Sequence, residues 1–197
     1  SKGSSAAIST EVAILSMQRS MNGFRGPRDI FRNPEALFRQ FEPTNGDSPF
    51  DLLLSHSGDD FAVMGMHFKI GLYEHQSAGA LQCLLNLIQQ DPSIALEPEK
   101  ITSIHITAYE PAFGIIGDPA KRDPKTRQSA DHSMVYIVSA MLKKAQDVAK
   151  EEGAAFFNQS NDEIWKRFML TPYDFDIDAV FHPTARAIME TVSFDHG

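Results

Sequence analysis

Apolar residues recur along the chain with two different periods, and each period predicts one kind of element. A spacing of three or four positions is typical of a helix with one buried face, and strict alternation is typical of a strand. The helical period predicts helices over residues 6–21, 27–41, 75–90, 129–150, 161–170 and 183–192. Alternation or a short apolar run predicts strands over residues 50–54, 61–70 and 101–109, and a further strand that begins at 192–194.

Residue types at the element boundaries refine this pattern. Gly23 is well placed to end the first helix. Ser129 or Asp131 is the candidate N-cap of the long helix that follows. In the segment 101–109, every second residue faces the same side if the segment is extended: Thr102, Ile104, Ile106 and Ala108. This alternation predicts a strand with one buried face.

The order of these elements indicates the fold class. Helices and strands are interspersed, and the strands lie close together in the sequence. Short gaps between strands favour an antiparallel or mixed sheet with helices packed on it, so we expect an α+β fold. Because the first part of the chain has only the helical pattern, we expect residues 1–45 to be separate from an α+β domain over residues 46–197.

Charge and composition exclude several classes of protein. The net charge of −8 argues against nucleic-acid binding, because phosphates need a basic face. An acidic protein that binds an acidic metabolite needs a local basic pocket instead. No apolar run reaches the roughly 18–20 residues that cross a bilayer, so we expect no membrane partner. The chain begins Ser1-Lys2-Gly3, without Met, and we expect the native N-terminus to lie upstream.

The single cysteine gives a prediction about the compartment. Cys83 cannot form an internal disulfide, so we expect an intracellular, reducing environment. We also expect its side chain to be buried, because it lies in the middle of a helix beside Leu84 and near Leu81.

The junction between the predicted strand and the helix at residue 75 carries the most informative chemistry. Lys69 ends the strand, and His75, Gln76 and Ser77 open the helix. Lys69 could pair with a carboxylate, and His75 could transfer a proton, since its ordinary pKa lies near neutrality. A helix start also offers free N–H groups to an anion. The alternative is a helix cap beside an incidental surface lysine.

A second candidate lies at the start of the next long helix. Asp131 could cap that helix, and His132 beside it could transfer a proton or serve as a hydrogen-bonded structural residue. A metal site is not indicated, because the Cys and His residues lack the spacing of metal ligands. A loop with four basic residues could hold carboxylates or could simply be solvated: Lys121, Arg122, Lys125 and Arg127.

Two segments together resemble one enzyme family. The segment HFKIGLYEHQSAGAL (67–81) and the segment RQSADHSMVYIVSAML (127–142) are similar to blocks of the 2-methylcitrate dehydratase/cis-aconitate decarboxylase family. In the second block Asp131, His132 and Tyr136 match, whereas Ala130 stands where the family usually has Arg.

The resemblance implies an architecture and an activity. Members of the family have an all-helical body followed by an α+β lid, with the active site between them. The resemblance therefore implies that residues 1–45 end the helical body and that residues 46–197 form a lid truncated at its C-terminus. The implied activity is elimination of water from 2-methylcitrate to give 2-methylaconitate, in the methylcitrate cycle of propionate catabolism. The alternatives are decarboxylation of cis-aconitate and a non-catalytic lid or interaction module.

The resemblance also assigns roles and partners. It implies His75, His132 and Asp131 as catalytic residues, with Lys69, Gln76 and Ser77 as substrate-binding residues. It implies a small tricarboxylate substrate, no cofactor, no metal and a homodimer. The missing N-terminal helical domain would carry the other catalytic residues, so the isolated fragment is expected to be inactive. The expected compartment is the mitochondrial matrix in a eukaryote and the cytoplasm in a bacterium.

Overall fold

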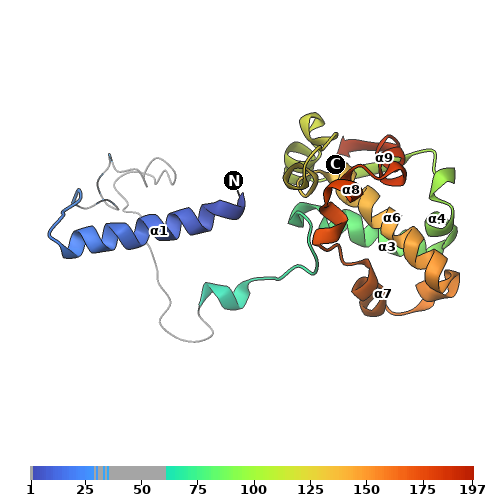
Figure 1. The fold of residues 1–197 in the computed structure, drawn as a ribbon, viewed down its shortest axis with the longest axis horizontal. Coiled ribbons are helices and arrows are strands. Elements are labelled where there is room, and N and C mark those ends of the chain that lie inside the picture. The colour runs from blue at the N-terminus through green and yellow to red at the C-terminus, as the bar shows by residue number, and fades with distance from the viewer. Residues whose placement is uncertain (1, 29, 31–32, 34, 36–60) are drawn as a thin grey trace. The chain divides into compact units, whose positions relative to one another are not determined.

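The computed structural model describes residues 2–28, 30, 33, 35 and 61–197 (Figure 1). The chain divides into two compact units, Ser1–Met66 and His67–Gly197. The predicted strand over 50–54, the predicted boundary after residue 45 and most of the predicted helix over 27–41 lie outside the described residues. Among the described residues, no helix combines the length and apolarity that crossing a membrane requires.

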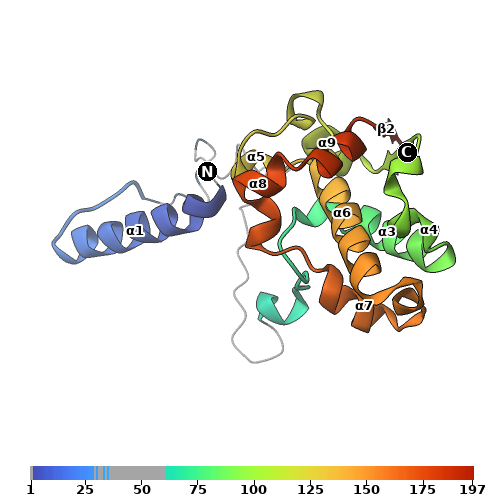
Figure 2. The ribbon, with the colours of Figure 1, turned by 45° about the vertical axis from the view of Figure 1, so that its right-hand side comes forward.

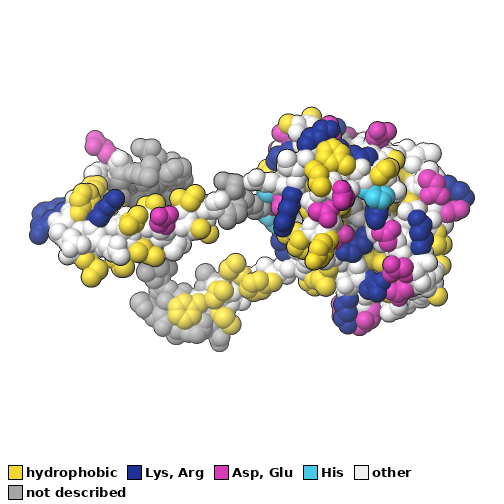
Figure 3. Space-filling model, in the orientation of Figure 1, with side chains coloured by type: hydrophobic (Ala, Val, Ile, Leu, Met, Phe, Trp, Pro, Cys, Tyr) yellow, Lys and Arg dark blue, Asp and Glu magenta, His cyan; other side chains and the backbone are white. Residues whose placement is uncertain are grey.

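The first unit contains one long helix, α1 (Lys2–Met21), which confirms the helix predicted over 6–21. The chain turns after it at Gly23, whose positive φ of 92° suits a residue without a side chain. The helix leaves several large apolar side chains exposed to solvent, which the space-filling view also shows (Figure 3): Ile8, Val12, Ile14, Leu15 and Met17.

The segment predicted as a strand over 61–70 is not a strand. Residues Ala62–Gly65 form a 3-10 helix in which Met64 N donates a hydrogen bond to Phe61 O at 2.9 Å. No described strand pairs with this segment, and a strand without a partner leaves its backbone groups unpaired. Local hydrogen bonds therefore replace the ladder that alternation alone had suggested.

The second unit is built around a central helix. The helix α6 (Met134–Glu152) contacts α3 (Ala78–Gln90), α4 (Ser93–Leu96), α7 (Asn161–Phe168) and α9 (Pro183–Met189), as Figures 1 and 2 show from two sides. The bounds of α3, α7 and α9 confirm the helices that were predicted over 75–90, 161–170 and 183–192. Two further short helices are α5 (Arg127–Ala130) and α8 (Ile177–Val180).

Single-turn helices connect these elements. Short 3-10 helices occur at His75–Ser77, Pro98–Lys100, Pro119–Lys121, Ala154–Asn158 and Pro172–Phe175, and a π-helix at Ala112–Ile116.

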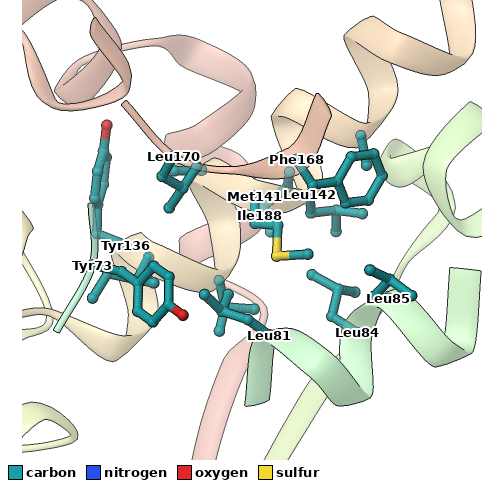
Figure 4. Packing of buried hydrophobic residues seen from close by; sticks show 14 of the residues in the cluster. Tyr73, Leu81, Leu84, Leu85, Tyr136, Met141, Leu142, Phe168, Leu170 and Ile188 are labelled. Atoms are coloured by element: carbon teal, nitrogen blue, oxygen red, sulfur yellow. The ribbon is translucent and has the colours of Figure 1, made fainter. Parts of the chain in front are cut away.

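The core lies between α6 and its neighbours (Figure 4), where the following side chains meet: Leu81, Leu84, Leu85, Met141, Leu142, Phe168 and Ile188. Burying a side chain of this size contributes roughly 2 kcal/mol.

The long helix predicted over 129–150 is interrupted near its start. Thr126 and Ser129 form a capping box at α5, and Ser133 caps α6 by accepting a hydrogen bond from Tyr136 N at 3.2 Å. The predicted caps, Ser129 and Asp131, are therefore wrong for the long helix. Ser129 is already engaged with Thr126, and Ser133 lies one residue before the first turn of α6, where a cap must lie.

The sheet consists of β1 (Ile104–Ala108) and β2 (Val192–His196), which pair in parallel with Ile104 opposite Val192. The α+β class and the strands predicted over 101–109 and from 192 onwards are confirmed. The expected antiparallel or mixed pairing is wrong for these two strands, because the long helical connection between them permits the crossover that parallel strands need. The face of β1 that carries Ile104, Ile106 and Ala108 is more buried than the face that carries His105, as alternation predicted.

The prediction that Cys83 is buried is wrong. Its side chain is exposed, because the buried stripe of α3 is formed by the following residues: Leu81, Leu84, Leu85 and Ile88. Position 83 lies beside this stripe rather than on it.

Candidate functional site

The turn before α3 is fixed by contacts to a distant segment. Gly71 has a φ of 87°, and a Cβ at this position would lie 3.3 Å from the backbone N and O of Leu170. Leu72 N donates a hydrogen bond to Leu170 O at 2.7 Å. A glycine is required here because other residues rarely adopt this φ. The turn holds residues 73–77 at the start of α3.

A buried carboxylate organises the 3-10 turn at His75–Ser77. The Glu74 side chain is only 4% exposed, and its Oε2 accepts a hydrogen bond from Gln76 N at 2.7 Å. The backbone carbonyl of Glu74 accepts a hydrogen bond from Ser77 Oγ, also at 2.7 Å. Ser77 is fully buried, so in this arrangement its hydroxyl stabilises the turn.

An open hollow of about 510 Å³ lies beside this turn, and we call it the basic hollow. It is lined by residues 67–70 and by five further side chains: Tyr73, His75, Ala78, Gln82 and Trp165. The His75 side chain is 70% exposed. Lys69 and His75, which the sequence singled out together, therefore border the same opening.

Lys69 is held against the aromatic ring of Tyr73. Its Nζ donates a hydrogen bond to the backbone carbonyl of Tyr73 and lies 4.9 Å from the centre of the ring. Burial raises the pKa of the Tyr73 phenol, and a hydrogen bond with the backbone of Ile70 offsets part of this effect. The result is an ammonium group fixed at the rim of the basic hollow.

His75 contacts the carboxylate beneath it. Its Nδ1 lies 2.7 Å from Glu74 Oε1. The sequence analysis gave Glu74 no role. The signal that could have identified it is its place directly before the histidine, at the cap of a helix start.

Gln76 lies at a different opening. It lines a second hollow of about 370 Å³ between α3 and β1, which we call the apolar hollow because mostly apolar residues surround it. Its Oε1 is buried and accepts no hydrogen bond from the described residues. The structure thus does not bring Gln76 and Ser77 into the basic hollow with Lys69.

Asp131 and His132 lie in the break between α5 and α6. His132 Nδ1 donates a hydrogen bond to Gln128 O at 3.0 Å and also contacts Asp131 Oδ1. The single Nδ1 proton serves the carbonyl, so Asp131 Oδ1 is buried without a hydrogen bond from the described residues. Neither residue is among those that line the basic hollow.

Three of the basic residues between 121 and 127 have structural partners. Lys121 Nζ donates to Ile115 O, Arg122 Nε donates to Gly117 O at 3.3 Å, and Lys125 pairs with Asp123. On the face shown in Figure 3, acidic and basic side chains of the second unit are interspersed. Among the described residues, no group of three or more His, Cys, Asp and Glu side chains is arranged to hold a metal ion.

These observations define an α+β domain with an ammonium and an imidazole at one open hollow. The model of the MmgE/PrpD C-terminal domain matches residues 73–197, which is more than half of the chain. The chain therefore belongs to the MmgE/PrpD family, which includes hydro-lyases, and membership supports a dehydratase-family function. No curated protein gives a significant match.

Proposed function

We propose that this chain is the C-terminal part of a hydro-lyase that eliminates water from 2-methylcitrate to give 2-methylaconitate. Residues 1–45 are proposed to end a helical body domain, and residues 46–197 to belong to the lid. The observation that carries the proposal is that Lys69 and His75, both from the segment that resembles the family, line one open hollow. The substrate is a small tricarboxylate, as in the methylcitrate cycle.

Lys69 is the carboxylate partner in this proposal. Removal of a proton next to a carboxylate builds negative charge on that carboxylate, and a nearby cation stabilises the charge. The contacts of Lys69 with Tyr73 fix its ammonium at the hollow. A preorganised charge is more effective than one that must reorient during the reaction.

His75 is the proposed proton-transfer residue. Elimination of water needs a base that removes the proton and an acid that protonates the departing hydroxyl group. A mostly exposed imidazole at the hollow can reach a bound ligand, and histidine is the side chain that most often serves in proton transfer. Asp131 and His132 remain second choices, because they match the family block but do not line this hollow.

The other half of the site is proposed to lie on a helical domain outside these 197 residues. The exposed apolar side chains of α1, such as Ile8 and Val12, support a packing partner for that helix. We also propose a homodimer, on the resemblance alone. The isolated chain should accordingly show little turnover of 2-methylcitrate, and robust turnover would refute the assignment as a fragment.

The test is a kinetic comparison in the full-length enzyme. We expect His75→Ala to lower kcat/KM on 2-methylcitrate by about 100-fold or more, the range of general acid–base catalysis. The matched control is His105→Ala, which removes an exposed histidine of β1 away from the basic hollow. An unchanged kcat/KM for His75→Ala would refute its role, and itaconate as the product would indicate the decarboxylase instead.

A further inference from the structure

We propose that the open edge of β1 binds one extended segment of another polypeptide, which lies in the apolar hollow as an additional strand. The segment is uncharged and carries apolar side chains at alternate positions. Its backbone bonds to β1, and one of its peptide N–H groups donates to the Gln76 amide. The apolar hollow shares no lining residue with the basic hollow, so this site is separate from the one proposed for the tricarboxylate.

The first step of the argument is the direction of the backbone groups of β1. Ile104 N donates a hydrogen bond to Thr191 O at 2.8 Å, so the even-numbered residues of β1 bond to β2. Successive residues of a strand point their N–H and C=O groups to opposite edges. His105 and Thr107 therefore point theirs to the other edge, where the described residues supply no strand. An edge of this kind is a template for a further strand.

The second step is that the apolar hollow runs along this edge. Every residue from 104 to 109 lines it. A hollow over one face of a strand would be lined by alternate residues only, because side chains alternate between the two faces. The other walls come from one side of α3 and from α6: Gly79, Ala80, Cys83, Leu84, Leu87, Met134 and Val138. The space beside the edge of β1 is thus already bordered by apolar side chains.

The third step is the chemistry of these walls, which defines the occupant. The described residues that line the apolar hollow include no Lys, Arg, Asp or Glu, so a charged segment would be buried there without a partner for its charge. An extended, uncharged segment can cover the apolar walls with every second side chain. In strand addition, main-chain hydrogen bonds supply affinity, and the pockets for alternate side chains supply specificity.

The fourth step is a buried amide without a partner. Gln76 lines the apolar hollow and is 8% exposed, and its Oε1 accepts no hydrogen bond from the described residues. An amide oxygen that is buried without a donor destabilises the free chain, and a peptide N–H in the hollow supplies that donor. A small apolar molecule would satisfy neither this amide nor the backbone groups of His105 and Thr107.

The experiment is amide hydrogen exchange followed by NMR on the 197-residue chain, with a capped pentapeptide of alternating valine and threonine as the probe. Without the peptide, we expect the amides of His105 and Thr107 to exchange at least about tenfold faster than those of Ile106 and Ala108, which bond to β2. Excess peptide should slow the two fast amides at least about tenfold. The same peptide with N-methyl groups on its backbone cannot donate to β1 and should give no protection.

Two matched variants test the place of binding. Gly79 lines the apolar hollow, and a Cβ there would meet nothing within 4 Å, so Gly79→Leu should fill the hollow and prevent protection by the peptide. Asn86 is exposed on the same helix and does not line the hollow, so Asn86→Leu should leave the protection unchanged. If Gly79→Leu does not fold, the comparison of the two peptides still decides.

Four results would overturn the proposal. The first is slow exchange of His105 and Thr107 in the free chain, which would mean that the edge is not open. The second and third are an absence of protection by the peptide and equal protection by its N-methylated form. The fourth is protection that grows with the concentration of the chain alone, which would identify a second copy of the chain as the occupant.

Discussion

His75 and Gln76 are adjacent in the sequence, yet each lines a different hollow beside α3. The 3-10 turn rotates neighbouring side chains apart, so the imidazole borders the basic hollow while the amide borders the apolar one. A polar pair that reads as one motif in the sequence is therefore divided by the geometry of the turn. The roles of both residues stay predictions until variants are measured.

The turn at Gly71 should be sensitive to any side chain. We expect Gly71→Ala to destabilise the chain by about 1 kcal/mol or more, because the residue has a positive φ and its Cβ would press on Leu170. Urea unfolding measures this change. The matched control is Gly79→Ala in α3, where a Cβ meets nothing within 4 Å and should stabilise by a few tenths to about 1 kcal/mol. Equal effects of the two variants would contradict this explanation.

The ion pair between Lys144 and Asp174 should contribute to stability. Asp174 Oδ2 accepts hydrogen bonds from Lys144 Nζ at 2.8 Å and from the backbone and hydroxyl of Thr171 at 2.7 and 2.9 Å. Because both side chains are mostly buried, Lys144→Met should cost roughly 1–3 kcal/mol of unfolding free energy. The exposed pair of Lys166 with Glu163 is the control, and Lys166→Met should cost less than about 0.5 kcal/mol.

Tyr136 should stabilise the fold through its hydroxyl group, which donates a hydrogen bond to Asp174 O at 2.6 Å. We expect Tyr136→Phe to cost about 1 kcal/mol, since the carbonyl loses its partner. Tyr173→Phe, which alters a tyrosine that is 82% exposed, should be nearly neutral. Chemical denaturation of both variants near neutral pH tests this difference, and a neutral Tyr136→Phe would refute it.

The same residue predicts how stability depends on alkaline pH. Burial raises the pKa of Tyr136 above its ordinary value of 10.0, and the charges of Asp174 and Asp176 raise it further. The folded state thus holds the phenol proton more tightly than the unfolded state does. This contribution is complete below pH 10.0 and is lost as the pH rises towards the folded-state pKa. Between pH 10.0 and the folded-state pKa, Tyr136→Phe should therefore lose stability less steeply than the wild type. Tyr73, whose pKa is also raised by burial, contributes a slope of the same sign in both proteins.

Cys83 should react with a thiol reagent in the folded chain. Its side chain is exposed and borders the apolar hollow. We expect one equivalent of a coloured disulfide reagent to react without denaturant, because accessibility controls the reaction together with the thiolate fraction. A reaction that begins only in denaturant would show that the thiol is buried after all.

The sequence predicted the long periodic elements well, and the reason is physical. In α3 the apolar residues that recur with the helical period, such as Leu81 and Leu85, are the residues that the fold buries. The sequence pattern therefore predicts the helix correctly. The segment 61–70, which contains the 3-10 helix Ala62–Gly65, is an apolar run that resembles a strand in sequence. Pairing with a neighbouring strand decides whether a strand forms, and the sequence pattern of one segment gives no information about that neighbour. The break before α6 arises because Thr126 caps the short helix α5 and Ser133 caps α6 as a new helix, which the spacing of apolar residues alone does not reveal.

The candidate site was predictable in part. Lys69 and His75 follow from residue type and from the family-like segment, and they do line one hollow. Which of the next residues faces that hollow depends on the pitch of one 3-10 turn, so Gln76 and Ser77 were grouped with them although they point elsewhere. Glu74 was missed because a carboxylate before a helix is most often only a cap.

The central claim is that Lys69 and His75 act on the same bound acid, and a double-mutant cycle in the full-length enzyme tests it most directly. We predict that Lys69→Met and His75→Ala each lower kcat/KM on 2-methylcitrate, and that the double variant loses less than the product of the two single losses, because residues that share one ligand are coupled. Single variants that leave kcat/KM unchanged, or losses that multiply as if the two sites were independent, would contradict the account.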